Sequence, residues 1–280
     1  MTRVITKVDE ISGQYEGFLF DAYGVLFDDR QMISGAKEVW EQLKLQGKSL
    51  WILTNGSSKT VAEAAAAYRA KGLDVSEEQI INSASLLGDF IAEQGLQGSR
   101  TAVLGTASSA SYVSAAGAMC VDPLKDDFEV LVVANQGDYP FVPTLDQVIS
   151  RILERYDRGL SCTLILTNPD FIYPKDRGQY GFTAGCVALL IEAALRARLG
   201  PATPRFERLG KPFPRIYAEA VRRAGTSSLL MVGDQLETDI RGAQNFGLDS
   251  LLVGTGLVNV RTWQPSADDP RPTYILEEWS

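Results

Sequence analysis

The chain has 280 residues, of which 45% are hydrophobic and 22% charged, so it can bury a sizeable core and form two domains of ordinary size. Its formal net charge is −8 and its Lys and Arg residues do not cluster, which argues against a nucleic-acid partner. No apolar run is as long as a membrane span, and residues 1–9 lack the apolar middle of a signal peptide. The sequence therefore predicts a cytoplasmic protein that does not bind a membrane.

The His and Cys content of the chain narrows the possible catalytic and metal-binding chemistry further. The chain contains no His, which excludes Ser-His-Asp and Cys-His nucleophiles and His-ligated zinc. Its Cys residues, Cys120, Cys162 and Cys186, have no Cys-x-x-Cys spacing and indicate neither a disulfide framework nor a zinc site. Acid, base and metal chemistry must therefore fall to carboxylates, Lys, Tyr and water.

The first predicted elements form a strand, a helix and a second strand. Residues 18–20 are a short apolar run that ends at Asp21 and a glycine turn, which is typical of a buried parallel strand. Residues 35–47 have helical spacing of apolar side chains and end at a glycine. Residues 49–53 form the next apolar run, which leads into Thr54-Asn55-Gly56. Polar groups therefore follow both strands directly.

Helical signals come next. Residues 57–71 combine the capping-box pattern Thr60-x-x-Glu63 with an alanine run and a glycine stop, which predicts a helix. Ser76-x-x-Gln79 has the same capping pattern and predicts another helix, interrupted near residues 82–83.

From about residue 86 the pattern indicates a second α/β unit. Three apolar runs predict strands, helical stretches separate them, and a long helix follows before a Gly- and Pro-rich segment at 200–204. The predicted strands are 101–105, 130–134 and 162–167, and the helices lie near 109–116, 145–158 and 185–198. We expect a core domain of residues 1–84 and 206–280, interrupted by an inserted domain of residues 85–205.

The last part of the chain returns to the first pattern. A helix is expected from Pro214 to residue 223 and another over 239–246. Apolar runs at 229–232 and 251–253 lead into Gly233-Asp234 and into Gly254-Thr255-Gly256. The pattern predicts an α/β fold whose core is a doubly wound parallel sheet. The carboxyl ends of its strands would converge on one crevice.

That crevice would combine carboxylates with one amine. It would hold Asp21, Asp234 and Asp239, together with Lys211 and the polar groups of residues 54–56. Carboxylates that repel one another fit around a hard cation, and Mg²⁺ prefers a few carboxylates, waters and a substrate phosphate. An Asp at a strand end can act as a nucleophile through an aspartyl-phosphate.

Each of these residues also has a structural explanation when taken alone. An Asp after a strand can cap a helix, a Lys before Pro is usually solvated, and Thr-Asn-Gly is commonly a turn. The order and spacing of the residues together favour the functional interpretation.

These motifs, in this order, resemble those of the haloacid dehalogenase superfamily. The insertion between the second and third motifs, and Thr167-Asn168-Pro169-Asp170, resemble its class IIA members. These include p-nitrophenyl phosphatase-like and nucleotide or sugar phosphate phosphatases. The matching stretches are Asp21-x-Tyr23-Gly24-Val25-Leu26, Thr54-Asn55, Lys211-Pro212 and Gly233-Asp234-Gln235-x-x-x-Asp239.

The resemblance implies a role for each matching position. Asp21 would be the nucleophile, and Lys211 would neutralise charge between it and the phosphate. Thr54, Asn55 and the Gly56 amide would hold the phosphoryl oxygens of a small phosphorylated substrate. Mg²⁺ would be bound by Asp21, Asp234 and the backbone carbonyl of Tyr23, with Asp239 behind them. The insertion would be a mobile cap, and because relatives with such a cap often pair through it, a homodimer is a further expectation.

The chain departs from the family at one position. Family phosphatases carry a second Asp two residues after the nucleophile as general acid and base, and here that residue is Tyr23. The loss of such a group typically lowers the rate by about 10² to 10⁴. A slow Mg²⁺-dependent phosphohydrolase is therefore expected, or one that acts on aryl or acyl phosphates.

Two alternatives remain open. One is a catalytically silenced protein that binds a phosphorylated metabolite, and the other is a dehalogenase, whose first motif also reads Asp-x-Tyr-Gly. The retained metal-binding pattern at Asp234 and Asp239 argues against the dehalogenase. Plausible substrate contacts in the insertion are residues 136–139 and 170–177.

Overall fold

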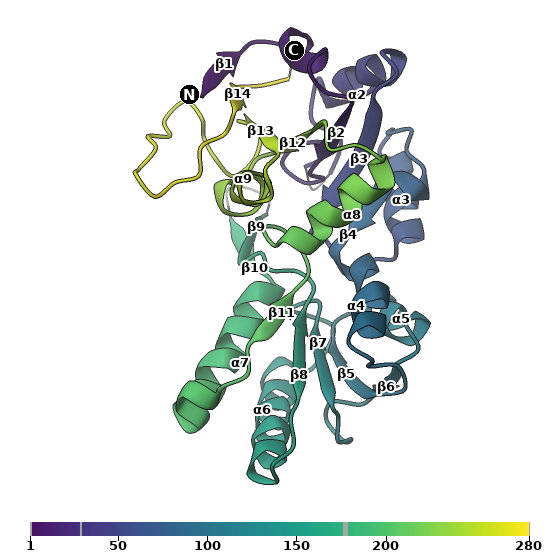
Figure 1. Ribbon diagram of the computed structural model, residues 1–280, viewed down its shortest axis with the longest axis vertical. Coiled ribbons are helices and arrows are strands. Elements are labelled where there is room, and N and C mark those ends of the chain that lie inside the picture. The colour runs from purple at the N-terminus through teal and green to yellow at the C-terminus, as the bar shows by residue number, and fades with distance from the viewer. Residues whose placement is uncertain (1, 29, 176–178, 280) are drawn as a thin grey trace. The chain divides into compact units, whose positions relative to one another are not determined.

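The computed structural model describes residues 2–28, 30–175 and 179–279, which form two compact units (Figure 1). The first unit comprises Met1–Thr54, Val61–Asn82 and Lys211–Ser280, and the second comprises Asn55–Thr60 and Ser83–Gly210. The two units are described separately below. No helix among the described residues combines the length and the apolar character that crossing a bilayer would require.

The first unit is built on a seven-stranded sheet in which every neighbouring pair is parallel, as the sequence predicts. Its strand order is β1-β14-β13-β12-β2-β3-β4. The strands are β1 (Arg3–Ile5), β2 (Gly17–Phe20), β3 (Ser49–Thr54), β4 (Ile80–Asn82), β12 (Leu229–Gly233), β13 (Asp249–Val253) and β14 (Tyr274–Leu276).

Helices cover both faces of this sheet, which explains why its central strands are apolar on both sides. Phe18 and Phe20 of β2 face a core cluster that includes residues of α2 and α3, whereas Leu19 is buried toward the other face, where α8 and α9 pack. The helices of this unit are α1 (Asp9–Ser12), α2 (Ala36–Leu45), α3 (Val61–Ala70), α8 (Pro214–Ala224) and α9 (Arg241–Phe246). The doubly wound fold class is thereby confirmed.

The sheet has a topological switch point between β2 and β12. From β2 the chain proceeds outward through β3 to β4, and it later returns to the other side of β2 with β12, β13 and β14. Ligands of open α/β sheets bind outside the carboxyl ends of the strands at such a point. Asp21 and Asp234, which directly follow β2 and β12, lie at this position.

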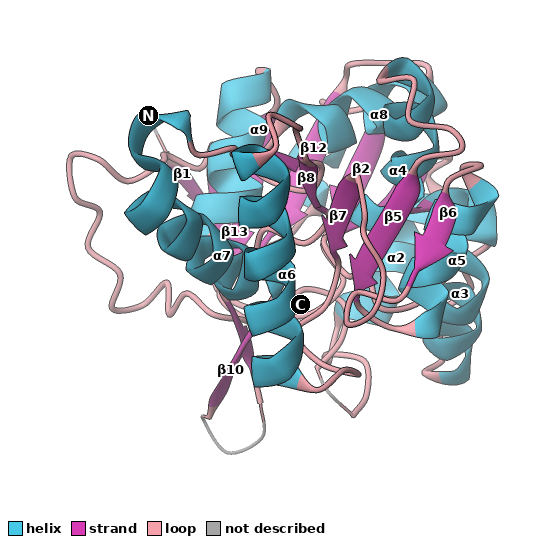
Figure 2. Ribbon diagram, turned by 90° about the horizontal axis from the view of Figure 1, so that it is seen from below, coloured by secondary structure: helices cyan, strands magenta, loops and turns pink. Residues whose placement is uncertain are grey.

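The second unit has its own parallel sheet of five strands in the order β11-β8-β7-β5-β6. Figure 2 labels four of these strands, β8, β7, β5 and β6. One face packs on α6 and α7. The strands are β5 (Arg100–Leu104), β6 (Met119–Val121), β7 (Val130–Val133), β8 (Thr163–Leu166) and β11 (Phe206–Arg208), with the hairpin β9 (Ile172–Pro174) and β10 (Tyr180–Phe182). The helices are α4 (Leu87–Glu93), α5 (Ala107–Ala115), α6 (Phe141–Asp157) and α7 (Ala184–Leu199), with the 3₁₀ turns η2 (Ser83–Leu86) and η4 (Gly200–Ala202).

The structure corrects the helix predicted after Ser76. The capping box of Ser76 and Gln79 is present, but it caps only a 3₁₀ turn, η1 (Glu77–Gln79). The next residues form strand β4, which pairs with β3 in the register Ile52 with Ile80. The adjacent β-branched residues Ile80 and Ile81 are both fully buried, so packing in the sheet outweighs the local helix signal.

Two further predicted boundaries lie elsewhere in the structure. Residues 206–208, assigned to the core domain from the sequence, form β11 and hydrogen bond to β8 in the sheet of the second unit. The helix predicted over 239–246 begins earlier, because a π-helical turn, η5 (Leu236–Ile240), precedes α9. Residues 1–15, for which the sequence predicts no element, contain β1 and α1.

Trp40 packs α2 against the sheet, and its substitution tests this packing. Its indole ring is fully buried and lies 5.4 Å from the ring of Phe20, centroid to centroid. We expect Trp40→Ala to lower the free energy of unfolding by about 3–5 kcal/mol, because it removes a large buried side chain and leaves a cavity. Urea denaturation followed by circular dichroism measures this change.

The matched control is Leu45→Ala in the same helix, where the side chain is 89% exposed. It should change the free energy of unfolding by no more than about 0.5 kcal/mol. Equal effects of the two substitutions would contradict the assignment of Trp40 to the core.

Candidate active site

The parallel pairing of β2 and β12 brings two aspartates to one edge of the first unit's sheet. Phe20 is in register with Val232, and the Asp21 backbone N–H donates to the Val232 carbonyl at 2.9 Å. Both side chains are buried, with Asp21 6% and Asp234 1% exposed. Two buried carboxylates at adjacent strand ends require positive charge nearby.

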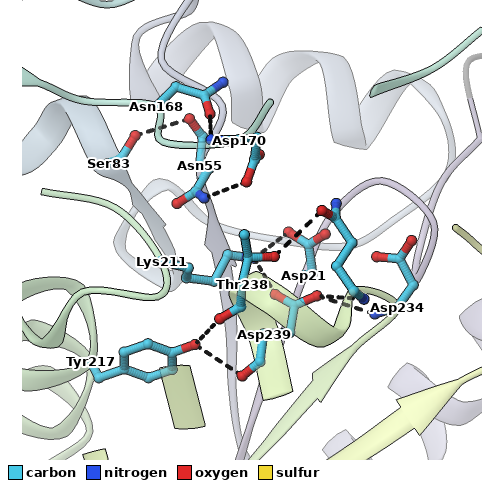
Figure 3. A network of polar contacts seen from close by, with 11 residues as sticks. Asp21, Asn55, Ser83, Asn168, Asp170, Lys211, Tyr217, Asp234, Thr238 and Asp239 are labelled. Atoms are coloured by element: carbon cyan, nitrogen blue, oxygen red, sulfur yellow. Dashed lines mark hydrogen bonds and ion pairs between the residues drawn. The ribbon is translucent and has the colours of Figure 1, made fainter. Parts of the chain in front are cut away.

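Lys211 supplies part of that charge. Its Nζ atom lies 2.7 Å from Asp21 Oδ1 and 2.7 Å from Asp239 Oδ1, and the lysine side chain is only 2% exposed (Figure 3). A lysine that follows a loop and precedes a proline would ordinarily be solvated. Its burial between two carboxylates shows that the fold places it at this point of the sheet edge.

Asp239 shapes the loop after β12. Its Oδ2 atom accepts hydrogen bonds from the backbone N–H groups of Asp234 and Gln235, both at 3.1 Å. Gly233 is required beside it, because a Cβ at that position would overlap the Asp239 side chain. The Tyr217 hydroxyl lies 3.1 Å from the Asp239 carbonyl oxygen and so contacts the π-helical turn. Asp239 therefore connects Lys211 to the backbone that carries Asp234.

Asp234 sits in a cradle made mostly of backbone. Its Oδ2 atom accepts from the Leu257 N–H at 2.8 Å. A Cβ at Gly24, which has a φ of 87°, or at Gly256 would overlap the carboxylate. Among the described residues, the Oδ1 atom of Asp234 is one of a few buried side-chain polar atoms that have no hydrogen-bond partner.

The electrostatics at Asp234 are unfavourable for an isolated carboxylate. Burial, together with the charges of Asp21 and Asp239, raises its pKa well above the ordinary value for Asp, and the Leu257 N–H only partly opposes this effect. Carboxylate oxygens of the three aspartates lie within 4.8 Å of one another. Three carboxylates exceed the single charge of Lys211, so the residues present fit a hard divalent cation.

Tyr23 lies on the loop after β2, two residues beyond Asp21, and is 40% exposed. Its ring centroid is 6.4 Å from that of Phe27, which stacks on Tyr68 at 4.7 Å. The Lys71 ammonium group lies 5.5 Å from the centroid of the Tyr23 ring. The structure therefore surrounds this position with aromatic and cationic groups.

The predicted phosphate-binding residues are divided between the two units. Thr54 is the buried last residue of β3 in the first unit, whereas Asn55 and Gly56 belong to the second. The Asn55 Nδ2 atom donates to Asp170 Oδ1 at 2.8 Å, an interaction that the sequence does not predict. In the insertion, residues 136–139 and 170–175 are described, and residues 176 and 177 lie outside the described residues.

Sequence reasoning also missed the groups that hold Asp234. The signal was available in Gly254-x-Gly256, which follows β13 as a glycine turn. The sequence does not show that this turn packs against Asp234, because the close approach of Gly256 to the carboxylate arises only in the folded chain.

The chain matches sequence models of one family over more than half of its length. A model described as haloacid dehalogenase-like hydrolase matches residues 18–119, and a second, described as HAD-hydrolase-like, matches residues 208–279. The two matches contain the four predicted motifs between them.

Similar proteins include phosphatases. An acid sugar phosphatase of Staphylococcus aureus is 29% identical over 269 residues, or 95% of each chain. A possible sugar phosphatase of the same superfamily from Cytophaga hutchinsonii has a structure with a TM-score of 0.84 and 27% identity, covering 100% of this chain and 99% of that one. A glycerol phosphate phosphatase from Mycobacterium tuberculosis, solved in complex with magnesium, has a TM-score of 0.81 and 28% identity, covering 96% and 76%. Together with the site geometry, these matches establish that the chain belongs to the haloacid dehalogenase-like hydrolases.

Proposed function

We propose that this protein is a Mg²⁺-dependent phosphohydrolase that acts on a small phosphorylated metabolite. The observation that carries the proposal is the group of three buried carboxylates near Lys211, in which one buried oxygen of Asp234 has no hydrogen-bond partner among the residues that the structure describes. The names of the similar proteins, which include acid sugar phosphatase and glycerol phosphate phosphatase, support the same activity.

The metal would be held by Asp21, Asp234 and the backbone carbonyl of Tyr23. Asp239 acts behind them, because its own carboxylate oxygens are engaged by Lys211 and by two backbone N–H groups. When bound, Mg²⁺ would neutralise the carboxylates and the phosphate oxygens. The cradle of Gly24, Gly256 and Leu257 keeps the Asp234 carboxylate in a single orientation.

In the proposed reaction an Asp21 carboxylate oxygen attacks the phosphorus atom. A bond forms between Asp21 and phosphorus, and the bond from phosphorus to the ester oxygen breaks with its electron pair remaining on the leaving oxygen. Lys211 holds the nucleophile through its 2.7 Å contact and offsets the charge that the carboxylate and phosphoryl group bring together. Water then attacks phosphorus, the bond between phosphorus and the Asp21 oxygen breaks with its electron pair returning to the carboxylate, and both protons of the water leave with inorganic phosphate.

Tyr23 limits which substrates are hydrolysed quickly. An alkyl ester leaves as a strongly basic alkoxide and needs a proton, which a positioned carboxylic acid would supply. Aryl and acyl phosphates have stable leaving groups and depend less on this proton. The proposed enzyme is therefore slow on alkyl esters and faster on phosphates with good leaving groups.

The same residue favours the second candidate, a protein that binds a phosphorylated metabolite without turnover. Such a protein would keep the charged site but would lack the general acid, and this chain has Tyr23 at the position of that acid. A dehalogenase is disfavoured. Its reaction at a carbon–halogen bond needs no metal ion, whereas three clustered carboxylates need a cation.

The leaving-group dependence gives a direct kinetic test. The native chain should release phosphate from p-nitrophenyl phosphate faster than from glycerol phosphate, and only with Mg²⁺. Tyr23→Asp should raise the glycerol phosphate rate by about 10²-fold and the p-nitrophenyl phosphate rate by less, because only the alkyl ester depends on the acid. Phosphate release followed by a colorimetric assay measures both rates.

Two control variants accompany this comparison. Tyr23→Phe should stay within about threefold of the native rates, and Asp21→Asn should abolish both reactions. No turnover by the native chain combined with tight phosphate binding would favour the silenced binder. Equal activity in EDTA would contradict the metal site.

The metal site has a test that does not depend on turnover. Mg²⁺ at about 100 times its Kd should raise the Tm of the native chain by about 5 °C, because a ligand that binds only the folded state stabilises it. Asp234→Asn should remove most of this shift. Differential scanning calorimetry measures it.

The matched control is Asp74→Asn in the same unit, where the carboxylate is 75% exposed and pairs with Lys44. This variant should keep the native response to Mg²⁺. An Asp234→Asn protein that responds to Mg²⁺ as the native chain does would show that the cation binds elsewhere.

A further inference from the structure

The segment Asn55–Thr60 follows β3 directly in the chain, yet its contacts belong to the second unit. Hydroxyl groups of three residues of the second unit donate to backbone carbonyls of this segment, and the Ser57 hydroxyl of the segment donates to a backbone carbonyl of that unit. The contacts are Ser83 Oγ to Asn55 O at 2.9 Å, Ser109 Oγ to Ser57 O at 2.8 Å, Thr106 Oγ1 to Ser58 O at 2.8 Å, and Ser57 Oγ to Ala134 O at 2.6 Å.

The Asn55 side chain is held at both ends. Its Nδ2 atom donates to Asp170 Oδ1 at 2.8 Å (Figure 3). Its Oδ1 atom lies against Gly210, where an added Cβ would overlap it. Asn55 is 2% exposed, so the side chain has little room for another rotamer. This fixed side chain in turn fixes the peptide between Asn55 and Gly56.

Asp170 lies between β8 and β9 and is itself held by hydrogen bonds, two of which come from residues at the start of α7. Its backbone N–H donates to Asn168 Oδ1 at 3.0 Å, and its carbonyl oxygen accepts from the Gly185 N–H at 3.1 Å and from the Thr183 hydroxyl. Gly185 allows this close approach, because a Cβ there would overlap the Asp170 carbonyl. The Asp170 carboxylate is therefore a fixed acceptor for Asn55.

We propose that Asp170 is a positioning residue that acts through Asn55 to keep the segment after β3 in its phosphate-binding conformation. This inference rests on the proposed function and on the role that the family resemblance implies for Asn55 and the Gly56 amide, which would bind the phosphoryl group. The phosphoryl group is common to every substrate and to inorganic phosphate. Loss of Asp170 should therefore weaken binding of all of them by the same factor, whatever the leaving group.

The test is a double-mutant cycle on Asp170 and Asn55. Asp170→Ala should weaken Mg²⁺-dependent binding of inorganic phosphate by about tenfold, as a lost hydrogen bond to a charged group does. It should lower kcat/KM for p-nitrophenyl phosphate and for glycerol phosphate by the same factor. With Asn55→Ala already present, Asp170→Ala should have no further effect, because Asp170 acts only through Asn55.

A conservative variant of Asp170 distinguishes a positioning role from general damage to the fold. Asp170→Asn keeps an acceptor oxygen for the Asn55 amide, so it should stay within about threefold of the native phosphate affinity. Asp170→Ser, whose side chain is too short to reach Asn55, should behave as Asp170→Ala does and provides the comparison if the alanine variant does not fold. The control is Asp146→Ala, an exposed position on α6 of the same unit, which should bind phosphate as the native chain does.

Calorimetric titration with inorganic phosphate distinguishes failure of the Asp170 proposal from failure of the proposed function. A native chain that binds phosphate, with an affinity that Asp170→Ala leaves unchanged, would overturn the role of Asp170 alone. Additive effects of the two alanine substitutions would do the same. A native chain that binds no phosphate in the presence of Mg²⁺ would overturn the proposed function and, with it, this inference.

Discussion

The first unit of this protein is constrained by the repulsion among three buried carboxylates. Asp21, Asp234 and Asp239 bring carboxylate oxygens within 4.8 Å of one another, and the Lys211 ammonium group contacts two of them, Asp21 and Asp239, each at 2.7 Å. Such a group is unfavourable in a buried environment unless further positive charge arrives. That charge is needed at Asp234, which is buried, has a raised pKa and keeps one oxygen with no partner in the described part of the chain.

Much of the surrounding backbone serves this arrangement. Gly24, Gly233 and Gly256 each lie where a Cβ would overlap one of the carboxylates, so the chain can approach them only as glycine. Asp239 accepts hydrogen bonds from the loop that carries Asp234, and the hydroxyl of Tyr217 contacts the turn that carries Asp239. The stability of the loops and the geometry of the charged group are therefore coupled. In the second unit, the Ser83 hydroxyl and the Asp170 carboxylate contact the segment that begins at Asn55.

Particular elements show what the sequence could predict. The apolar runs that end at Asp21 and Asp234 predict parallel strands, and because such strands align their carboxyl ends, they also predict that the two aspartates meet. The short outer strands β1, β4 and β14 have three residues each, too few for a periodic pattern to reveal.

Contacts between distant segments escape such reasoning for a different reason. Asn55 and Asp170 are 115 positions apart, and neither local propensity nor spacing indicates that they pair. The same holds for the cradle around Asp234, where the Leu257 N–H is contributed from 23 positions further along the chain. Motif residues can be read from one sequence, whereas the groups that orient them depend on how the loops pack.

In the proposed function, the excess negative charge at the ends of β2 and β12 binds a magnesium ion and, through it, a phosphoryl group. A crystal structure of the native chain grown with Mg²⁺ and tungstate, a phosphate mimic, tests this claim most directly. We predict a metal ion bound to Asp21 and to the now unpartnered oxygen of Asp234, with the oxyanion beside Asp21 and Lys211. Density for neither species at these residues, under conditions where both are in excess, would contradict the account.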